Sequence, residues 1–221
     1  TMWFTATAVV GSISPSGTIA TSNDATIIGG TRDVTVGGDD SVWFSTSTGL
    51  VRRDPGTGTF AAIPIAGDAP TLLTTTSDGD VWFVDEGNDV WSIPSDGDTT
   101  TPTLEEDLDP STGDEVISDM APDLAGGIWA VQPAGSLGSL LHVDAGGPLT
   151  ATILTEDSKV AGQGTRLAVA PDGTVWFTPS ADVMGRFTPT DGIDVLPIAE
   201  SARALAVGAD GNVWYRSDAV E

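Results

Sequence analysis

Short apolar segments alternate with turn residues along the whole chain, and no stretch shows sustained helical periodicity. The most regular segment has a tryptophan flanked by further apolar residues. These tryptophans are Trp3, Trp43, Trp82, Trp129, Trp176 and Trp214, at intervals of 38 to 47 residues. Self-similarity with this period is typical of repeat architectures. A seventh tryptophan, Trp91, lies outside the register.

The copy between residues 167 and 198 shows how each repeat is divided. It contains four apolar runs, and Asp172 and Gly173 separate the first run from the tryptophan run. Two apolar runs joined by Asp-Gly are typical of a β-hairpin, since both residues tolerate the positive φ of a tight turn. Apolar side chains occupy both alternating positions of the tryptophan run, which predicts a strand covered on both faces. Each repeat is therefore predicted to be a four-stranded antiparallel sheet.

Proline identifies the outermost strand of the predicted sheet. Pro64 and Pro197 lie within the fourth run of their repeats, and proline is confined to sheet edges because it cannot donate a ladder hydrogen bond. The fourth run is therefore predicted to be the outermost strand.

Repeated four-stranded sheets predict an all-β fold, a β-propeller. We expect residues 1–221 to form one propeller domain. Its repeats fall near residues 3–42, 43–81, 82–128, 129–175 and 176–213, with 214–221 closing the ring. Five blades are favoured because the last tryptophan strand can be a surplus strand at the seam, and six is the alternative.

The motifs PDGTVWFT (residues 171–178) and VMGRFTPTDG (residues 183–192) resemble the repeat of the streptogramin lyases, or virginiamycin B lyase-like propellers, and more loosely that of NHL propellers. The resemblance implies the propeller fold. It also implies a catalytic set of histidines and glutamates with magnesium at the central opening. His142 is the sole histidine of the chain, and it aligns with Arg186 in the third run, away from the axis. The lyase activity is therefore not expected.

Charge excludes some partners. The formal net charge is −24, from 32 acidic and 8 basic residues, so the surface repels nucleic acid and anionic lipid. No apolar run approaches the roughly 20 residues of a membrane-spanning helix, and the start lacks the basic residues of a secretory signal. We expect no nucleic-acid binding and no membrane insertion, and a place on a virion surface or outside the cell.

Three arginines near the start of the first run are candidates for ligand binding. They are Arg32, Arg166 and Arg203. In a propeller this strand lines the central channel, so their guanidinium groups would face an anion at its entrance. The alternative is local charge pairing with neighbours such as Asp33 and Asp119.

An acidic segment, residues 105–115, is the candidate metal site. Asp107, Asp109 and Ser111 have the spacing that begins an EF-hand loop, which favours Ca²⁺. The glycine comes one position late, at Gly113, and no glutamate closes the loop, so a solvated acidic loop is the alternative. The sequence indicates no other cofactor. The absence of cysteine excludes thiolate metal sites and disulfides.

These observations predict a non-catalytic β-propeller that acts as a structural or protein-interaction module. Its expected partners are other proteins in an oligomer or a multi-protein assembly, such as a bacteriophage virion or a cell surface. The alternative is a lyase-like or hydrolytic enzyme with an acidic, metal-assisted site at the channel mouth. A weaker alternative is a sugar-binding propeller, for which Trp91 is the candidate exposed tryptophan.

Overall fold

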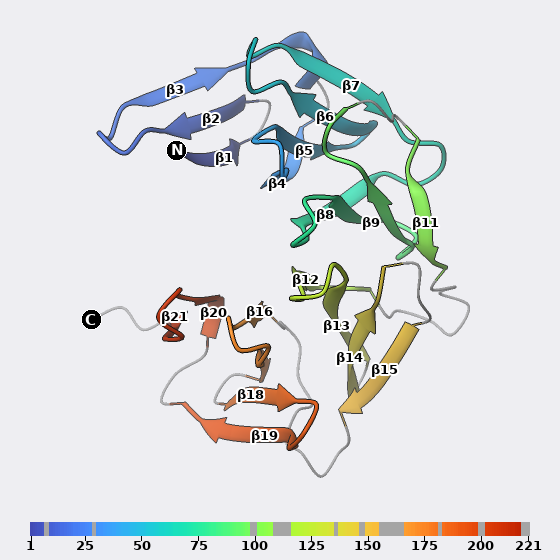
Figure 1. Ribbon diagram of the computed structural model, residues 1–221, viewed down its shortest axis with the longest axis vertical. Helices are drawn as coiled ribbons and strands as arrows, with labels where there is room; N and C mark the ends of the chain where they lie inside the picture. Colours follow the sequence, from blue (N-terminus) through green and yellow to red (C-terminus); the bar gives the residue numbers. More distant parts are fainter. Residues whose placement is uncertain are drawn as a thin grey trace. The chain divides into compact units, whose positions relative to one another are not determined.

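Strands make up almost all of the ordered structure. The computed structural model describes residues 1–6, 9–27, 30–97, 101–107, 116–134, 137–145, 149–154, 166–180, 183–198 and 202–217. Within these ranges the strands form six antiparallel sheets, and a 3₁₀ turn, η1 (Ala25–Ile27), is the one helical element (Figure 1). The all-β propeller fold is confirmed. None of the described residues forms a helix long and apolar enough to cross a membrane.

The first compact unit, residues 1–109, holds three sheets. In spatial order, the first sheet is β1 (Met2–Ala6), β2 (Val9–Ile13) and β3 (Ile19–Ser22); the second is β4 (Thr31–Val36), β5 (Val42–Thr46), β6 (Gly49–Arg53) and β7 (Phe60–Pro64); the third is β8 (Pro70–Thr75), β9 (Val81–Asp85), β10 (Val90–Ile93) and β11 (Thr103–Glu106). Strands β1, β4 and β8 are neighbours.

The second compact unit, residues 110–221, holds the other three sheets. The fourth sheet is β12 (Asp119–Pro122), β13 (Ile128–Ala134), β14 (Leu137–Val143) and β15 (Leu149–Leu154); the fifth is β16 (Leu167–Val169), β17 (Val175–Ser180), β18 (Val183–Thr188) and β19 (Gly192–Pro197); the sixth is β20 (Ala202–Val207) and β21 (Val213–Ser217). Strands β12, β16 and β20 are neighbours.

The hydrophobic core lies between successive sheets. Every residue of β5 and of β9 is buried, as expected for strands covered on both faces. Trp43 of the second sheet packs in one cluster with Leu73 and Phe83 of the third. In the second unit, Val131 of the fourth sheet packs with Phe177 of the fifth. Burial of such side chains contributes about 1.5–3 kcal/mol each, so the stacking of sheets is the main source of stability.

Two tryptophans depart from the expected pattern. Trp214 is 66% exposed, because β20 is the one strand that pairs with β21 in the described part of the chain. Trp91 is half-buried rather than exposed: its ring stacks on Phe83 and its Nε1 donates to Asp85 Oδ2 at 2.9 Å. One face of Trp91 is thus covered by the core, and the side chain is less exposed than the sugar-binding alternative expected.

The strand order tests the predicted arrangement within each repeat. Pro64 and Pro197 lie in β7 and β19, the outermost strands of their sheets, as predicted. The described strands form six sheets. Strand β21, which carries the last tryptophan, pairs with β20 in the sixth of them. The number of blades, with five favoured and six as the alternative, stays a prediction. The first sheet has three strands and the sixth has two.

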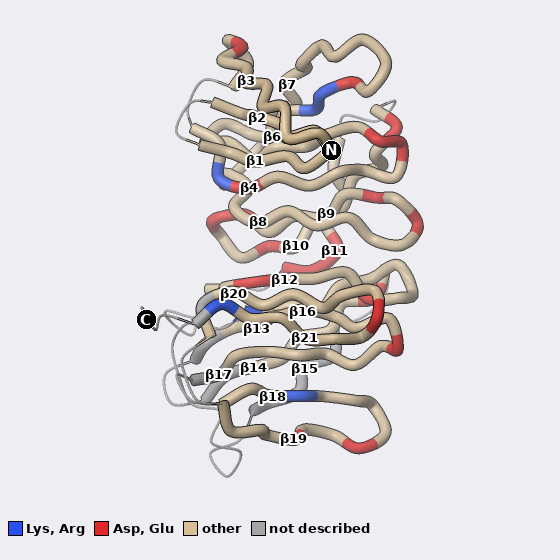
Figure 2. Tube along the Cα trace, turned by 90° about the vertical axis from the view of Figure 1, so that its left-hand side faces the viewer, with Lys and Arg blue, Asp and Glu red and all other residues tan. Residues whose placement is uncertain are grey.

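Acidic residues gather in the turns between strands, where the backbone trace of Figure 2 has red segments. Several turns share one geometry, in which the first residue donates its N–H to the carbonyl of the fifth: Gly37 to Ser41, Thr76 to Asp80, Asp123 to Gly127, Ala170 to Thr174, and Gly208 to Asn212. Equivalent positions can therefore be compared between sheets.

Candidate functional site

The three predicted anion-binding arginines do not share one compact unit. Arg32 lies in β4 of the first unit, and its Nη2 is 2.5 Å from Glu86 Oε1. Arg166 precedes β16 in the second unit, and its Nη1 donates to the Ser118 carbonyl at 3.3 Å. Arg203 lies in β20, and its side chain is outside the described part of the structure. Arg32 thus contacts a carboxylate of the third sheet, whereas Arg166 contacts a backbone carbonyl, and ligand binding by the three arginines stays a prediction.

Asp33 and Asp119, the expected partners of these arginines, hold backbone groups in place. Asp33 accepts hydrogen bonds from Val34 N–H and, across to the third sheet, from Leu73 N–H, both at 2.8 Å. Asp119 does the same in the second unit: it accepts from Met120 N–H at 3.1 Å and from Leu167 N–H of the fifth sheet at 2.9 Å. These carboxylates join adjacent first strands.

The predicted calcium-binding segment is described in part only. Asp107 is exposed and directly follows β11. Asp109 and Ser111 lie outside the described residues. The structure also shows that Glu105 and Glu106 belong to β11, the fourth strand of the third sheet, and not to a loop insertion. Strand β11 buries little apolar surface, because Leu104 is its one aliphatic residue and is 44% exposed.

His142 brings together a cluster of ionisable side chains in the fourth sheet. It lies on the third strand, β14, opposite Trp129, as the repeat alignment predicted. Its Nε2 is 2.7 Å from Asp123 Oδ2 and 3.8 Å from Asp144 Oδ1. The imidazole stacks on the Trp129 ring with centroids 4.3 Å apart. The single histidine is therefore held between two carboxylates at the turn end of a blade.

Asp123 is the anchor of this cluster. Its side chain is only 7% exposed, and its Oδ1 accepts N–H hydrogen bonds from Ala125 at 2.7 Å and Gly127 at 2.8 Å. Burial raises the pKa of the Asp123 carboxyl, but the hydrogen bonds from His142 and from these backbone groups outweigh burial and leave the pKa below its ordinary value. Asp123 is therefore ionised at neutral pH.

A sequence signal for part of this cluster exists. Asp144 follows His142 by two positions, as Asp54 follows Arg52 in the second sheet, and Arg52 lies opposite Trp43 as His142 lies opposite Trp129. Asp123 carries no such signal, because it is the first residue of its turn, whereas Asp39 of the second sheet is the third. Sequence reasoning identified His142 but missed both carboxylates.

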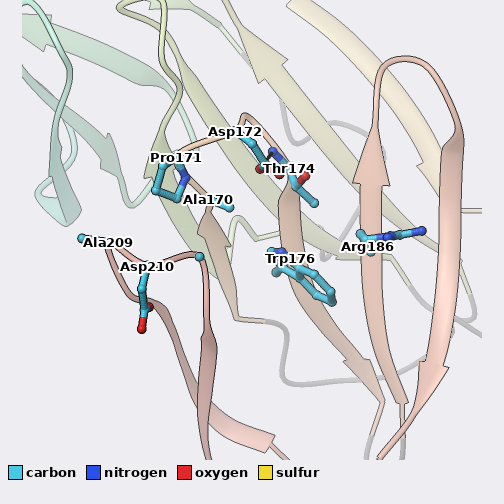
Figure 3. Close-up of a pocket in the computed structure, with 9 residues that line it drawn as sticks. Ala170, Pro171, Asp172, Thr174, Trp176, Arg186, Ala209 and Asp210 are labelled. Carbon is cyan, nitrogen blue, oxygen red and sulfur yellow. Dashed lines mark hydrogen bonds between the residues drawn. The ribbon is translucent and has the colours of Figure 1, made fainter.

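A hollow of about 330 Å³ lies between the turns of the fifth and sixth sheets (Figure 3). Its lining residues come from both turns and from β17 and β18: Ala170, Pro171, Asp172, Thr174, Trp176, Arg186, Ala209, Asp210 and Gly211. Arg186 Nη2 donates to Asp194 Oδ2 at 3.0 Å. Trp176 is half-buried, whereas its equivalent Trp43 is fully buried. We attribute the hollow to the sixth sheet, whose two strands, β20 and β21, cover the fifth sheet only in part.

Comparison with known proteins identifies the fold. No protein-family model matches the sequence, and no curated protein matches it either. Virginiamycin B lyase from Staphylococcus aureus is similar in structure, with a TM-score of 0.76 and 20% identity over 97% of this chain and 73% of that chain. A catalytically inactive variant of that enzyme, solved with quinupristin and carrying alanine in place of a histidine, gives a TM-score of 0.75 and 20% identity over 98% and 73%.

A gluconolactonase from Xanthomonas campestris is a more distant structural neighbour, with a TM-score of 0.60 and 16% identity over 94% of this chain and 75% of that chain. At these identities the likeness extends to architecture and not to chemistry. The chain therefore has a β-propeller fold of the type found in virginiamycin B lyase.

Proposed function

We propose that this protein is a non-catalytic β-propeller that binds other proteins within a larger assembly, such as a virion or a cell surface. The observation that carries the proposal is the surface of β21, by which we mean Trp214, Tyr215 and the edge of the strand facing away from β20. Trp214 is 66% exposed and Tyr215 is 42% exposed. No strand pairs with that edge among the described residues.

The chemistry of this surface suits the docking of a β-strand from a partner protein. An unpaired edge offers backbone N–H and C=O groups to an added strand, and this is a recurring mode of peptide recognition. Adjacent residues of a strand point to opposite faces, so Trp214 and Tyr215 would contact a partner on both sides of the sheet. Tryptophan and tyrosine are the residues most often found at the energetic centres of interfaces.

The positions of the ionisable groups support a role without catalysis. Catalysis by general acids and bases needs side chains free to exchange protons with a substrate. On the first strands of their sheets, Asp33 and Asp119 each accept two backbone hydrogen bonds, one of which comes from the first strand of the next sheet. The sole histidine, His142, is on a third strand and bonded to Asp123. A histidine substitution accompanies the inactive state of the lyase neighbour, and this chain has no second histidine to supply such a group.

The size of the native species tests the proposal. We expect the protein in extracts of its source to elute in size-exclusion chromatography well above the 22.5 kDa of the chain. The double variant Trp214→Ser and Tyr215→Ser should elute as the free chain, because it loses the aromatic contacts. Ile19→Ser is the matched control, since Ile19 is 63% exposed on a different sheet, and it should leave the large species intact.

Two results would overturn the proposal. One is a native species of 22.5 kDa, or a large species that the double variant leaves unchanged. The other is turnover of quinupristin by the purified protein with Mg²⁺, at a rate that scales with protein concentration, which would favour the lyase-like alternative. Separate chromatography of the purified chain distinguishes self-association from binding to a different protein.

A further inference from the structure

We propose that Asp123, His142 and Asp144 form a binding site for one divalent transition-metal ion, of which Zn²⁺ is the representative case. One ligand atom from each residue lies within 4.8 Å of the other two. Imidazole nitrogen and carboxylate oxygen are donors that Zn²⁺ and its neighbours prefer, whereas Ca²⁺ and Mg²⁺ prefer oxygen alone. The site is independent of the β21 surface.

The distances in the cluster fit a tetrahedral ion with small adjustments. Zinc bonds of about 2.0–2.1 Å place neighbouring ligand atoms about 3.3 Å apart. Nε2 of His142 is now 2.7 Å from Asp123 Oδ2 and 3.8 Å from Asp144 Oδ1, so one separation must grow and the other shrink by about half an ångström. Asp144 is 53% exposed, which leaves the fourth position of the ion open to water.

Two of the three ligands are held in place before any ion binds. Oδ1 of Asp123 is fixed by the N–H groups of Ala125 and Gly127, which leaves Oδ2 directed at His142. The ring of His142 is fixed by stacking on Trp129. Ligands that are already oriented lose less conformational entropy on binding, and their supporting contacts raise metal affinity.

Gly127 provides an independent observation. A Cβ at this position would collide with the Val143 carbonyl oxygen, and it would lie 3.0 Å from Asp144 Cα and 3.1 Å from Asp123 Oδ2. Equivalent turn positions in the other sheets carry side chains: Ser41, Asp80, Thr174 and Asn212. Gly127 is not among the glycines with positive φ, so the close approach, and not the backbone conformation, explains it. The missing side chain lets Asp144 reach the neighbourhood of Asp123.

The position opposite the tryptophan, on the third strand of a sheet, accommodates a cation between two carboxylates in the second sheet. There the residue opposite the tryptophan is Arg52, with Nη2 2.5 Å from Asp39 Oδ2 and Nη1 3.6 Å from Asp54 Oδ2. In the fourth sheet the smaller imidazole replaces the guanidinium, while two carboxylates remain. A divalent ion bound by all three side chains would place positive charge between the two carboxylates, as the guanidinium does in the second sheet.

Calorimetric titration of the full chain with ZnCl₂ tests the site. We expect one Zn²⁺ to bind more tightly to the wild type than to His142→Arg, by at least about tenfold, since loss of a ligand should cost no less than loss of an outer contact. His142→Arg recreates the arrangement of Arg52, so the fold should persist and its circular dichroism should be unchanged. Co²⁺ should give the visible absorption of a tetrahedral site with the wild type only. MgCl₂ should not compete.

Further variants make the result specific to these residues. Asp144→Asn should weaken the same binding event, and Asp68→Asn, at an exposed carboxylate outside both candidate metal sites, should not. Arg52→His should add a second binding event, because Asp39 and Asp54 flank that position. Equal Zn²⁺ affinity in the wild type and His142→Arg would overturn the proposal and identify the cluster as a histidine–carboxylate pair without a metal. Equal affinity in wild type and Asp144→Asn would exclude Asp144 as a ligand.

Discussion

The carboxylate of Asp33 accepts a hydrogen bond of 2.8 Å from the backbone N–H of Leu73, and so joins the first strand of the second sheet to the first strand of the third. Asp119 makes the same contact with Leu167 N–H between the fourth and fifth sheets. Side-chain packing also joins neighbouring sheets of a propeller. These two aspartates add directional bonds that fix the position of one inner strand against the next.

Removing one of these acceptors should weaken the fold. In Asp33→Asn the amide offers one acceptor oxygen where the carboxylate bonded both Val34 N–H and Leu73 N–H. One of these backbone groups then loses its partner, which costs about 1–3 kcal/mol of unfolding free energy. Urea denaturation followed by tryptophan fluorescence measures the change. Asp107→Asn, at an exposed site, is the control, and an equal effect there would refute the explanation.

Arg52 joins the second sheet to the turn between β10 and β11. Its Nε donates to the Ser95 carbonyl at 3.0 Å, and its Nη2 donates to Asp39 Oδ2 and to the Asp96 carbonyl at 3.2 Å. Lysine keeps the charge but cannot reproduce this planar set of donors. We therefore expect Arg52→Lys to lower the unfolding free energy by about 1–2 kcal/mol, measured by urea denaturation at pH 7.

The pH dependence of the unfolding free energy tests whether the Arg52→Lys effect comes from the ion pair with Asp39. Burial raises the pKa of Asp39, but hydrogen bonds from Ser41 and from Arg52 outweigh burial and leave the pKa lowered. A lowered carboxyl pKa stabilises the fold above the unfolded-state pKa of about 3.9, and this stability is lost as the pH falls. The difference between wild type and Arg52→Lys should shrink below about pH 4. A difference that stays constant down to pH 2 would exclude the ion pair as its cause.

In contrast to the carboxyl of Asp39, the carboxyl of Asp80 has a raised pKa. Burial raises its pKa, and repulsion from Asp78, Asp96 and Glu105 raises it further. A raised carboxyl pKa means that the ionised form opposes folding, so the penalty is absent below the unfolded-state pKa and appears as the pH rises through the folded-state pKa. Asp80→Asn should therefore raise the melting temperature at pH 7, and the gain should vanish near pH 3. Asn212 occupies the equivalent turn position, which shows that the turn accepts asparagine.

The sequence predicts most of the strands because one apolar pattern repeats. A tryptophan flanked by apolar residues marks β5, β9, β13 and β17, and Asp-Gly marks the hairpins before several of them. Strand β11 escaped prediction because Thr103–Glu106 is half acidic and does not alternate. The blade number is not given by the pattern either, since it depends on which strands pair where the ring closes, and a repeat pattern does not contain that information.

The candidate sites were predicted less completely than the fold. Spacing identifies residues that recur at equivalent positions, such as Arg52 and His142. It does not identify a carboxylate that has moved within a turn and contacts a distant histidine, as Asp123 does, or one that bonds to a backbone N–H group of the next sheet, as Asp33 does. Both uses of aspartate depend on contacts between residues far apart in the chain, so only the structure shows them.

Gly185 and Phe177 provide the last prediction. They are opposite each other on β18 and β17, and a Cβ on Gly185 would collide with the fully buried Phe177 ring. Gly185→Ala should therefore cost about 1–3 kcal/mol of unfolding free energy through overpacking. Gly56→Ala, in an exposed turn where a Cβ would meet only Asp54 Oδ1 at an ordinary contact distance of 3.5 Å, is the control and should have little effect.

In the fourth sheet the small residue is on the second strand and the large one on the third: Ala130 is equivalent to Phe177, and Leu141, which lies opposite Ala130, is equivalent to Gly185. A smaller residue at position 177 should therefore create room for a side chain at position 185. We expect the double variant Gly185→Ala and Phe177→Leu to be more stable than the sum of the two single effects predicts, by about 1 kcal/mol in a double-mutant cycle. Additive effects would mean that the ring already moves aside in the single variant, and that the glycine is not required by the contact.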